Sequence, residues 1–178
     1  MYISEIFTSA PTDERIPVER QTYDTLEALK IPFERVDNDA AYSMEECEEI
    51  SKLLDVAICK NIFLCNQKKT SFYLLLLPGE KAFDTKSFCK KTGLSHVSFA
   101  PEEKMIELLD TIPGSASVFG VLNDKDDYVQ VLIDKEIADA EWFGCNPGNN
   151  TSHLKFKTKD LLNKVLPHAR HRARVIRL

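Results

Sequence analysis

Two pairs of apolar runs stand out along the chain. Residues 60–65 (KNIFLC) and 71–78 (SFYLLLLP) flank a short polar segment. Apolar runs of this length between turn formers are typical of buried strands, and a short polar turn joins antiparallel neighbours. Residues 118–124 (VFGVLND) and 127–134 (DYVQVLID) repeat the pattern around an acidic loop, Asp124–Asp127, which we expect to be exposed. The pattern therefore predicts two hairpins.

Helices are predicted from helical spacing of apolar residues and from residues that favour helix ends. Ser43 and Glu46 form the capping-box pattern S-x-x-E, in which each side chain binds a backbone N–H near the other residue. Asp84 is a favourable N-cap, and Gly93 suits the left-handed position after a helix. Thr158 is the predicted cap of the last helix. The predicted helices cover residues 18–29, 43–54, 84–93, 101–110 and 158–166, and shorter strands are predicted at 32–37, 96–100 and 153–157.

These elements together predict a mixed, partly antiparallel α/β sheet with flanking helices. Several successive strands are joined by short turns rather than by helices, which excludes a purely parallel sheet. No repeat, low-complexity tract or linker interrupts the chain, so we expect a single domain over residues 1–166. The Arg-rich residues 167–178 are predicted to form a basic C-terminal tail.

Charge is distributed unevenly over the 178 residues. Residues 1–163 contain all 28 acidic residues and 18 of the 23 Lys and Arg residues, which gives a net charge of −10. Residues 164–178 contain the remaining five bases and no acid, so the total is −5. Taken alone, an acidic chain is not expected to be a dedicated nucleic-acid binder.

Several classes of protein are excluded by features that the sequence lacks. No apolar segment is long enough to cross a membrane, and the first residues do not resemble a secretory signal, so we expect a cytoplasmic protein with no membrane partner. The five cysteines show neither CxxC nor zinc-site spacing and are expected to be reduced and mostly buried. Gly-rich nucleotide loops, HExxH and GxSxG are absent, so no metal site and no cofactor are predicted.

Three polar segments are candidates for a binding site. Lys60 and Asn61 begin a buried strand, where an ammonium group can bind a phosphate or a carbonyl oxygen, although a lysine that snorkels at a strand end is the simpler explanation. The small residues of Gly114–Ser117 allow backbone N–H groups to approach an anion. The amide-rich residues 146–151 can line a polar pocket. Ordinary surface turns are the simpler explanation of both loops.

The order of several motifs resembles one family. A Lys-Asn pair starts a strand, a Pro-Gly-Ser turn runs into FGVLND, and an Asn-Thr pair precedes a DLL helix, all within residues 15–166. In these features the chain resembles the freestanding prolyl-tRNA editing proteins of the YbaK-like aminoacyl-tRNA deacylase family. The resemblance implies a mixed sheet with flanking helices. In this family the same domain is also inserted in bacterial prolyl-tRNA synthetases.

This resemblance implies hydrolysis of the ester in mischarged tRNA(Pro), with Ala-tRNA(Pro) as the expected substrate, because a site for proline cannot fully exclude the smaller alanine. The implied catalytic residues are Lys60 and Asn61, and water attacks with help from a ribose hydroxyl, without metal, cofactor or protein nucleophile. The implied substrate-binding residues are Gly114, Ser115, Ala116, Ser117, Val118, Asn146, Asn150 and Thr151. The implied partners are the 3′ aminoacyl end of the tRNA and, as a candidate, prolyl-tRNA synthetase.

A substrate of this kind changes what the charge implies. Capture of a single-stranded CCA end needs only a few cations around one cleft, so an acidic chain is compatible with it. We expect the basic C-terminus to contact the acceptor stem through Arg170, Arg172, Arg174 and Arg177.

At three places the chain departs from the family that it resembles. Val118 stands where a Gly-x-x-x-Pro loop ends in proline, Asn146 replaces a histidine, and Asn38-Asp39 occupy the place of a His-Pro pair. These departures leave two alternatives open. One is the same reaction on seryl-, threonyl- or cysteinyl-tRNA, and the other is a non-catalytic module that binds tRNA or a synthetase.

Overall fold

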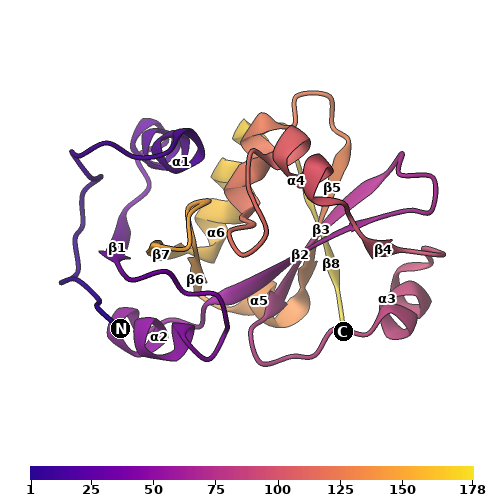
Figure 1. The fold of residues 1–178 in the computed structure, drawn as a ribbon, viewed down its shortest axis with the longest axis horizontal. Helices are drawn as coiled ribbons and strands as arrows, with labels where there is room; N and C mark the ends of the chain where they lie inside the picture. The colour runs from indigo at the N-terminus through magenta and orange to yellow at the C-terminus, as the bar shows by residue number, and fades with distance from the viewer.

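Two sheets lie next to each other along the long axis of the molecule, with helices around them (Figure 1). The computed structural model describes residues 1–178. The larger sheet has the strand order β4-β2-β3-β5-β8, and the smaller has the order β1-β7-β6. The strands are β1 (Phe33–Asp37), β2 (Cys59–Cys65), β3 (Phe72–Pro78), β4 (Ser98–Phe99), β5 (Val129–Asp134), β6 (Trp142–Cys145), β7 (Ser152–Lys157) and β8 (Ala173–Ile176). The helices are α1 (Pro17–Ala28), α2 (Cys47–Leu54), α3 (Thr85–Thr92), α4 (Glu102–Leu109), α5 (Lys135–Asp139), α6 (Thr158–Asp160) and α7 (Leu166–His168), with a 3₁₀ helix η1 (Val118–Asn123) and a π-helical turn η2 (Leu161–Val165).

The strand pairings confirm the predicted mixed α/β fold. β2 pairs with β3 and β4 in antiparallel orientation, whereas β5 runs parallel to both β3 and β8. The first predicted hairpin is confirmed as β2–β3, in which Lys60 lies opposite Leu77. A bridge between Ile58 and Gly144 joins the two sheets just before β2. A Cβ at residue 144 would lie 2.6 Å from the Ala57 carbonyl oxygen, so glycine is required for this close approach.

The second predicted hairpin is wrong. Residues 118–123 form η1, and β5 pairs with β3 instead. The Ser117 Oγ starts η1 by accepting the Phe119 backbone N–H at 3.2 Å. Because η1 is buried over nearly its whole length, its apolar run has no polar face, and its pattern is the same as that of a buried strand. Gly120 packs against α4, where a Cβ would lie 2.8 Å from the Cβ of Leu109.

Asp124 is buried, which corrects the prediction of a fully exposed acidic loop. Its carboxylate accepts the backbone N–H groups of Tyr128 and Val129, and its Oδ2 lies 2.9 Å from His171 Nε2. Asp124, the exposed Asp127 and His171 hold their ligand-type atoms within 4.8 Å of one another. Since Asp124 and His171 bond to each other, this cluster connects the loop before β5 to the segment before β8.

The predicted basic tail is also wrong, because the C-terminal segment belongs to the larger sheet. β8 pairs with β5 in parallel orientation, from Val131 opposite Ala173 to Asp134 opposite Ile176. Helical structure continues through Pro167 in α7 rather than ending there. The four-residue strands β6 and β8 have no counterpart among the predicted strands.

The other predicted elements are confirmed within a few residues, and most of their end signals act as expected. The Ser43 Oγ accepts the Glu46 N–H, and the Glu46 carboxylate accepts the Ser43 N–H at 3.0 Å. Asp84 accepts two N–H groups in the first turn of α3, and Gly93 ends that helix with φ 76°. Thr158 is an exception: its buried Oγ1 has no hydrogen-bond partner, so it does not cap the last helix.

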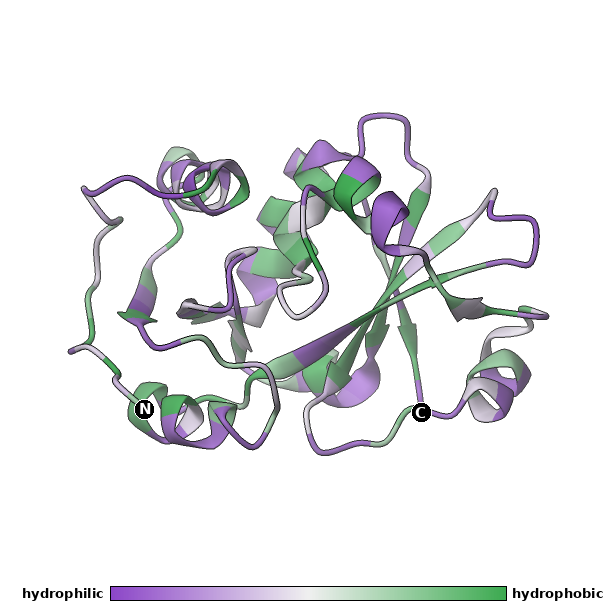
Figure 2. Ribbon diagram, viewed as in Figure 1, coloured by the Kyte–Doolittle hydropathy of each residue, from purple (hydrophilic) through white to green (hydrophobic).

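The main core lies along β3 and β5. Leu74, Leu76, Val131 and Ile133 are almost completely buried there and pack together with Phe119 of η1. Each such side chain contributes about 1.5–3 kcal/mol of favourable transfer free energy. Figure 2 shows hydrophobic residues concentrated on the central strands and hydrophilic residues on the connecting loops. None of the helices combines the length and the hydropathy that crossing a bilayer requires.

Candidate functional site

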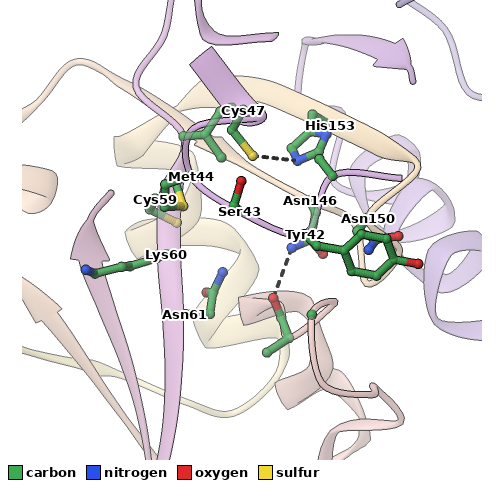
Figure 3. Close-up of a pocket in the computed structure, with 14 residues that line it drawn as sticks. Tyr42, Ser43, Met44, Cys47, Cys59, Lys60, Asn61, Asn146, Asn150 and His153 are labelled. Atoms are coloured by element: carbon green, nitrogen blue, oxygen red, sulfur yellow. Dashed lines mark hydrogen bonds between the residues drawn. The ribbon is translucent and has the colours of Figure 1, made fainter. Parts of the chain in front are cut away.

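One pocket collects residues from four separate segments of the chain (Figure 3). Its walls come from residues 41–47, which lead into α2, from residues 58–61 at the start of β2, from residues 114–116 before η1, and from residues 146–153, which lead into β7. The cavity has a volume of about 240 Å³. Pockets for drug-sized ligands have roughly 300–1,000 Å³, so this cavity suits a small chemical group.

The structure brings six of the ten predicted site residues to this pocket. They are Lys60, Asn61, Gly114, Ala116, Asn146 and Asn150. These residues are up to 90 positions apart in the chain and meet because β2, the loop before η1 and the turn before β7 converge beside the bridge between the sheets. Their role in binding and catalysis stays a prediction at this point.

Four predicted residues do not line the pocket, and their positions explain why. Val118 is fully buried in the main core, and Ser115 is also buried. The Ser117 Oγ donates to the Asn146 carbonyl oxygen at 2.7 Å and thereby connects two walls of the pocket. Thr151 lies in the turn before β7, where its N–H donates to the Asn149 side chain. Among the four, Ser117 therefore has a clear structural role, which is to position the loops.

Lys60 is the only charged side chain that lines the pocket. It forms no salt bridge, and its side chain extends away from Asn61 in Figure 3, as expected for neighbours in a strand. The Asn61 Oδ1 atom is buried and has no hydrogen-bond partner. An unpaired buried acceptor of this kind costs about 1–3 kcal/mol, so a ligand that donates a hydrogen bond to Asn61 would recover this energy.

Asn146 has a structural role in the pocket wall. Its Nδ2 donates to the Ala116 carbonyl oxygen at 3.0 Å, and its Oδ1 accepts the Gly148 N–H at 2.8 Å. Both ends of the side-chain amide are therefore used within the protein. The Ala116 N–H, by contrast, donates to no group of the protein, and Ala116 lines the pocket.

The pocket also contains residues that the sequence analysis did not single out as site residues. They are Ala41, Tyr42, Ser43, Met44, Cys47, Ile58, Cys59 and His153. Tyr42 is 75% exposed and lies at the rim beside Gly114. Burial raises the pKa of Cys47 and raises that of Cys59 to about 12, so both remain thiols near neutral pH.

His153 is the most informative of the missed residues. Its Nδ1 lies 2.9 Å from Asn38 Oδ1, and its Nε2 lies 3.9 Å from Cys47 Sγ. Burial lowers the pKa of His153 to about 4, so the ring is neutral at physiological pH. The one signal in the sequence was a histidine within a predicted strand, because its partners are more than 100 positions away.

One protein-family model matches most of the chain, and the matched range contains every residue that lines the pocket. The matching model is the aminoacyl-tRNA editing domain, over residues 38–164. The chain belongs to this family. It is therefore an aminoacyl-tRNA deacylase, a hydrolase of the ester that joins an amino acid to its tRNA. The resemblance seen in the sequence motifs is confirmed.

Relatives of this editing domain occur both as separate proteins and within synthetases. The prolyl-tRNA editing protein ProX of Acetoanaerobium sticklandii is 32% identical over 136 residues, which cover 76% of this chain and 83% of ProX. A proline–tRNA ligase of Methylobacillus flagellatus is 30% identical over 131 residues, which cover 70% of this chain and 22% of the ligase. The prolyl-tRNA synthetase associated domain-containing protein 1 of Bos taurus is 26% identical and covers 79% of this chain.

Solved structures confirm the fold of the editing domain. A protein described as a candidate trans-editing enzyme for prolyl-tRNA synthetase superposes with a TM-score of 0.66, at 14% identity, over 93% of this chain and 99% of its own. The hypothetical protein APE2540 superposes with a TM-score of 0.65, at 15% identity, over 88% of this chain and 98% of its own. At these identities the similarity concerns the fold alone.

Proposed function

We propose that this editing domain removes alanine from mischarged tRNA(Pro). The observation that carries the proposal is the small pocket that unites Lys60 and Asn61 with the loop at residues 114–116. The relative named as a prolyl-tRNA editing protein supports tRNA(Pro) as the nucleic acid. The cavity of about 240 Å³ supports a small amino acid. A second site that admits alanine but not proline completes a double sieve.

Each free group of the pocket has a place in this reaction. The unpaired Lys60 ammonium binds a phosphate near the 3′ end, and the free Ala116 N–H binds the ester carbonyl oxygen, where negative charge develops as water attacks. The Asn61 Oδ1 accepts a hydrogen bond from the α-ammonium group of the amino acid. The exposed ring of Tyr42 offers a surface on which the terminal base stacks. The products are free alanine and a tRNA with a free ribose hydroxyl.

Deacylation of Ala-tRNA(Pro) and Pro-tRNA(Pro) tests the proposal directly. We expect release of alanine and no release of proline. Lys60→Ala should lower the rate by about 100-fold or more, because it removes the one cation of the pocket, while circular dichroism shows a folded protein. Lys68→Ala changes an exposed lysine in the β2–β3 loop and serves as the control. A normal rate in Lys60→Ala would contradict the role of Lys60.

A non-catalytic module that binds tRNA or a synthetase is the second candidate. The observation that favours it is Asn146, whose polar atoms are all engaged within the protein. This candidate requires tRNA binding with no hydrolysis of any ester at high protein concentration. A panel of alanyl-, seryl-, threonyl- and cysteinyl-tRNA separates it from the deacylase and defines the amino-acid range.

Prolyl-tRNA synthetase is the protein partner that we propose. The synthetase of Methylobacillus flagellatus contains a segment similar to this chain, which supports a separate protein acting beside a synthetase. Both would act in the cytoplasm, where tRNA is charged. Co-purification with prolyl-tRNA synthetase, with and without tRNA, tests the association.

A further inference from the structure

The pocket has two chemically different ends. In Figure 3, Cys47 and His153 point toward each other at one end, and Asn61 lies apart from them at the other. Asn61 and its neighbour Lys60 in β2 are among the groups to which the proposed function assigns the reacting aminoacyl end. The end with Cys47 and His153 is therefore the place that the amino-acid side chain reaches.

Asn38 determines which nitrogen of His153 has the proton. The Asn38 Nδ2 donates to the carbonyl oxygens of Asp39 at 2.7 Å and of Asn150 at 3.0 Å. Both amide hydrogens of Asn38 are thus used, and its Oδ1 is left to accept from His153 Nδ1. Because the ring is neutral, a hydrogen on Nδ1 leaves Nε2 without one. The pocket therefore contains a hydrogen-bond acceptor in a fixed orientation.

The Nε2 atom has no strong partner within the protein. Its one neighbour is the Cys47 thiol at 3.9 Å, and a thiol is a weak donor. No Asp or Glu side chain lines the pocket, so no carboxylate competes for a donor group there. His153 is 3% exposed, so little of its ring is open to water. A hydroxyl group at this position would form the stronger hydrogen bond that the protein leaves open.

We propose that His153 is a specificity-determining residue that accepts a hydrogen bond from the side-chain hydroxyl of a seryl ester. This inference rests on the proposed deacylase function and extends its substrates from alanine to serine on the same tRNA. Alanine enters the pocket but offers no donor to Nε2. An amino acid of the size of serine with a methyl group in place of the hydroxyl leaves Nε2 desolvated and unpaired. The ester of such an amino acid is therefore hydrolysed more slowly than the seryl ester.

A nucleophilic role for the neighbouring thiol is less consistent with the geometry. Burial raises the pKa of Cys47, with a smaller contribution from Glu46, so the thiolate is disfavoured. The neutral His153 supplies no positive charge that would stabilise a thiolate. The 3.9 Å separation of Sγ and Nε2 is also that of a loose contact. The imidazole is better suited to hold a substrate than to activate Cys47.

The test compares three esters of one tRNA. The full-length protein is assayed on tRNA(Pro) charged with serine, with 2-aminobutyrate, which replaces the hydroxyl by a methyl group, or with alanine. In the wild type we expect kcat/KM for serine to exceed that for 2-aminobutyrate by about tenfold or more, which corresponds to one good hydrogen bond. His153→Leu should reduce this ratio to near one. His153→Gln, whose amide oxygen can accept, should restore part of it.

Matched measurements separate the possible results. His168→Leu changes an exposed histidine outside the pocket and should keep the wild-type ratio. A wild-type ratio near one, or a ratio that His153→Leu does not change, overturns the inference. An equal fall in kcat/KM for all three esters in a folded His153→Leu protein also overturns the inference, because His153 would then act in the chemical step. Hydrolysis of none of the three esters by the wild type refutes the proposed deacylase itself, which distinguishes the two failures.

Discussion

At the scale of single residues, two buried polar groups give the pocket its character. Asn61 and His153 each present an acceptor that the protein leaves without a strong partner. Folding alone would favour apolar residues at both positions, because an unpaired acceptor in a buried site lowers stability. A ligand that donates hydrogen bonds at both places removes this cost, so the two residues indicate the donor pattern of the ligand.

The buried neutral state of His153 predicts a specific dependence of stability on pH. The pKa of about 4 for His153 in the folded protein lies below the ordinary histidine value of 6.5. Between these values the unfolded chain binds a proton that the folded chain does not, so this contribution is complete above pH 6.5 and is lost as the pH falls toward 4. The wild type should therefore lose about 3 kcal/mol more unfolding free energy than His153→Gln between about pH 7 and about pH 4.

Urea unfolding of both proteins over a pH series measures this difference. The His153→Gln protein keeps every other titratable group, so their contributions cancel in the comparison. Parallel pH curves for the two proteins would mean that His153 is charged or accessible in the folded state. That result would also remove the argument for a free Nε2 acceptor.

At the scale of elements, one arginine connects the segments behind the pocket. Arg15 donates to Glu19 of α1 at 2.7 Å and to Asp37 of β1 at 2.8 Å. Glu19 is fully buried and also accepts the Asn149 side-chain N–H at 3.0 Å. Asn149 belongs to the turn that carries Asn146 into the pocket wall. Arg15 thus contacts α1 and β1 directly and connects to the turn before β7 through the buried Glu19 carboxylate.

Removal of this arginine should destabilise the protein strongly. Arg15→Met leaves the buried Glu19 carboxylate without its cation, and the loss of one partner of a buried ion pair costs about 3–5 kcal/mol. Asp13→Asn is the matched control, because Asp13 is an exposed partner of Arg15 and an exposed pair is worth about 0–1 kcal/mol. Urea denaturation at neutral pH measures both. If Arg15→Met lowers the free energy of unfolding by less than about 1 kcal/mol, Glu19 has found another partner.

At the scale of the whole molecule, the C-terminal segment both completes the sheet and adds positive charge to it. Arg172 and Arg177 flank β8, are exposed and form no salt bridge. Arg174 donates to the Thr92 carbonyl oxygen and so connects β8 to α3. Deletion of the C-terminus would remove a strand that pairs with β5, so it cannot test nucleic-acid binding separately from folding.

Two substitutions test the expected contact with the acceptor stem without removing β8. Arg172→Gln with Arg177→Gln should raise KM for the charged tRNA and lower the slope of log KM against log salt by about 1–2, since each lost phosphate contact removes about 0.7–0.9. Deacylation across a KCl series provides the measurement. Lys68→Gln with Lys69→Gln removes the same charge from the β2–β3 loop as a control. An unchanged slope would leave the arginines a role in solubility alone.

The sequence predicted local structure well where a local signal existed. The capping box at Ser43 and Glu46 and the αL position of Gly93 depend on neighbouring residues, and both are confirmed. The run at residues 118–123 was misassigned because a buried 3₁₀ helix and a buried strand have the same apolar pattern. Asp124 was misassigned because its partner, His171, lies 47 positions away.

The sequence by itself determined the mixed α/β class, the family, and the position of a lysine and an asparagine at the start of a central strand. These follow from periodicity, helix caps and ordered motifs, all of which are encoded in short segments. The tertiary structure alone decided that β8 joins the sheet, that Asn146 supports a loop, and that Asn38 orients His153 toward Cys47. Such facts depend on contacts between distant segments, and long-range packing determines which buried polar groups find partners and which remain open to a ligand.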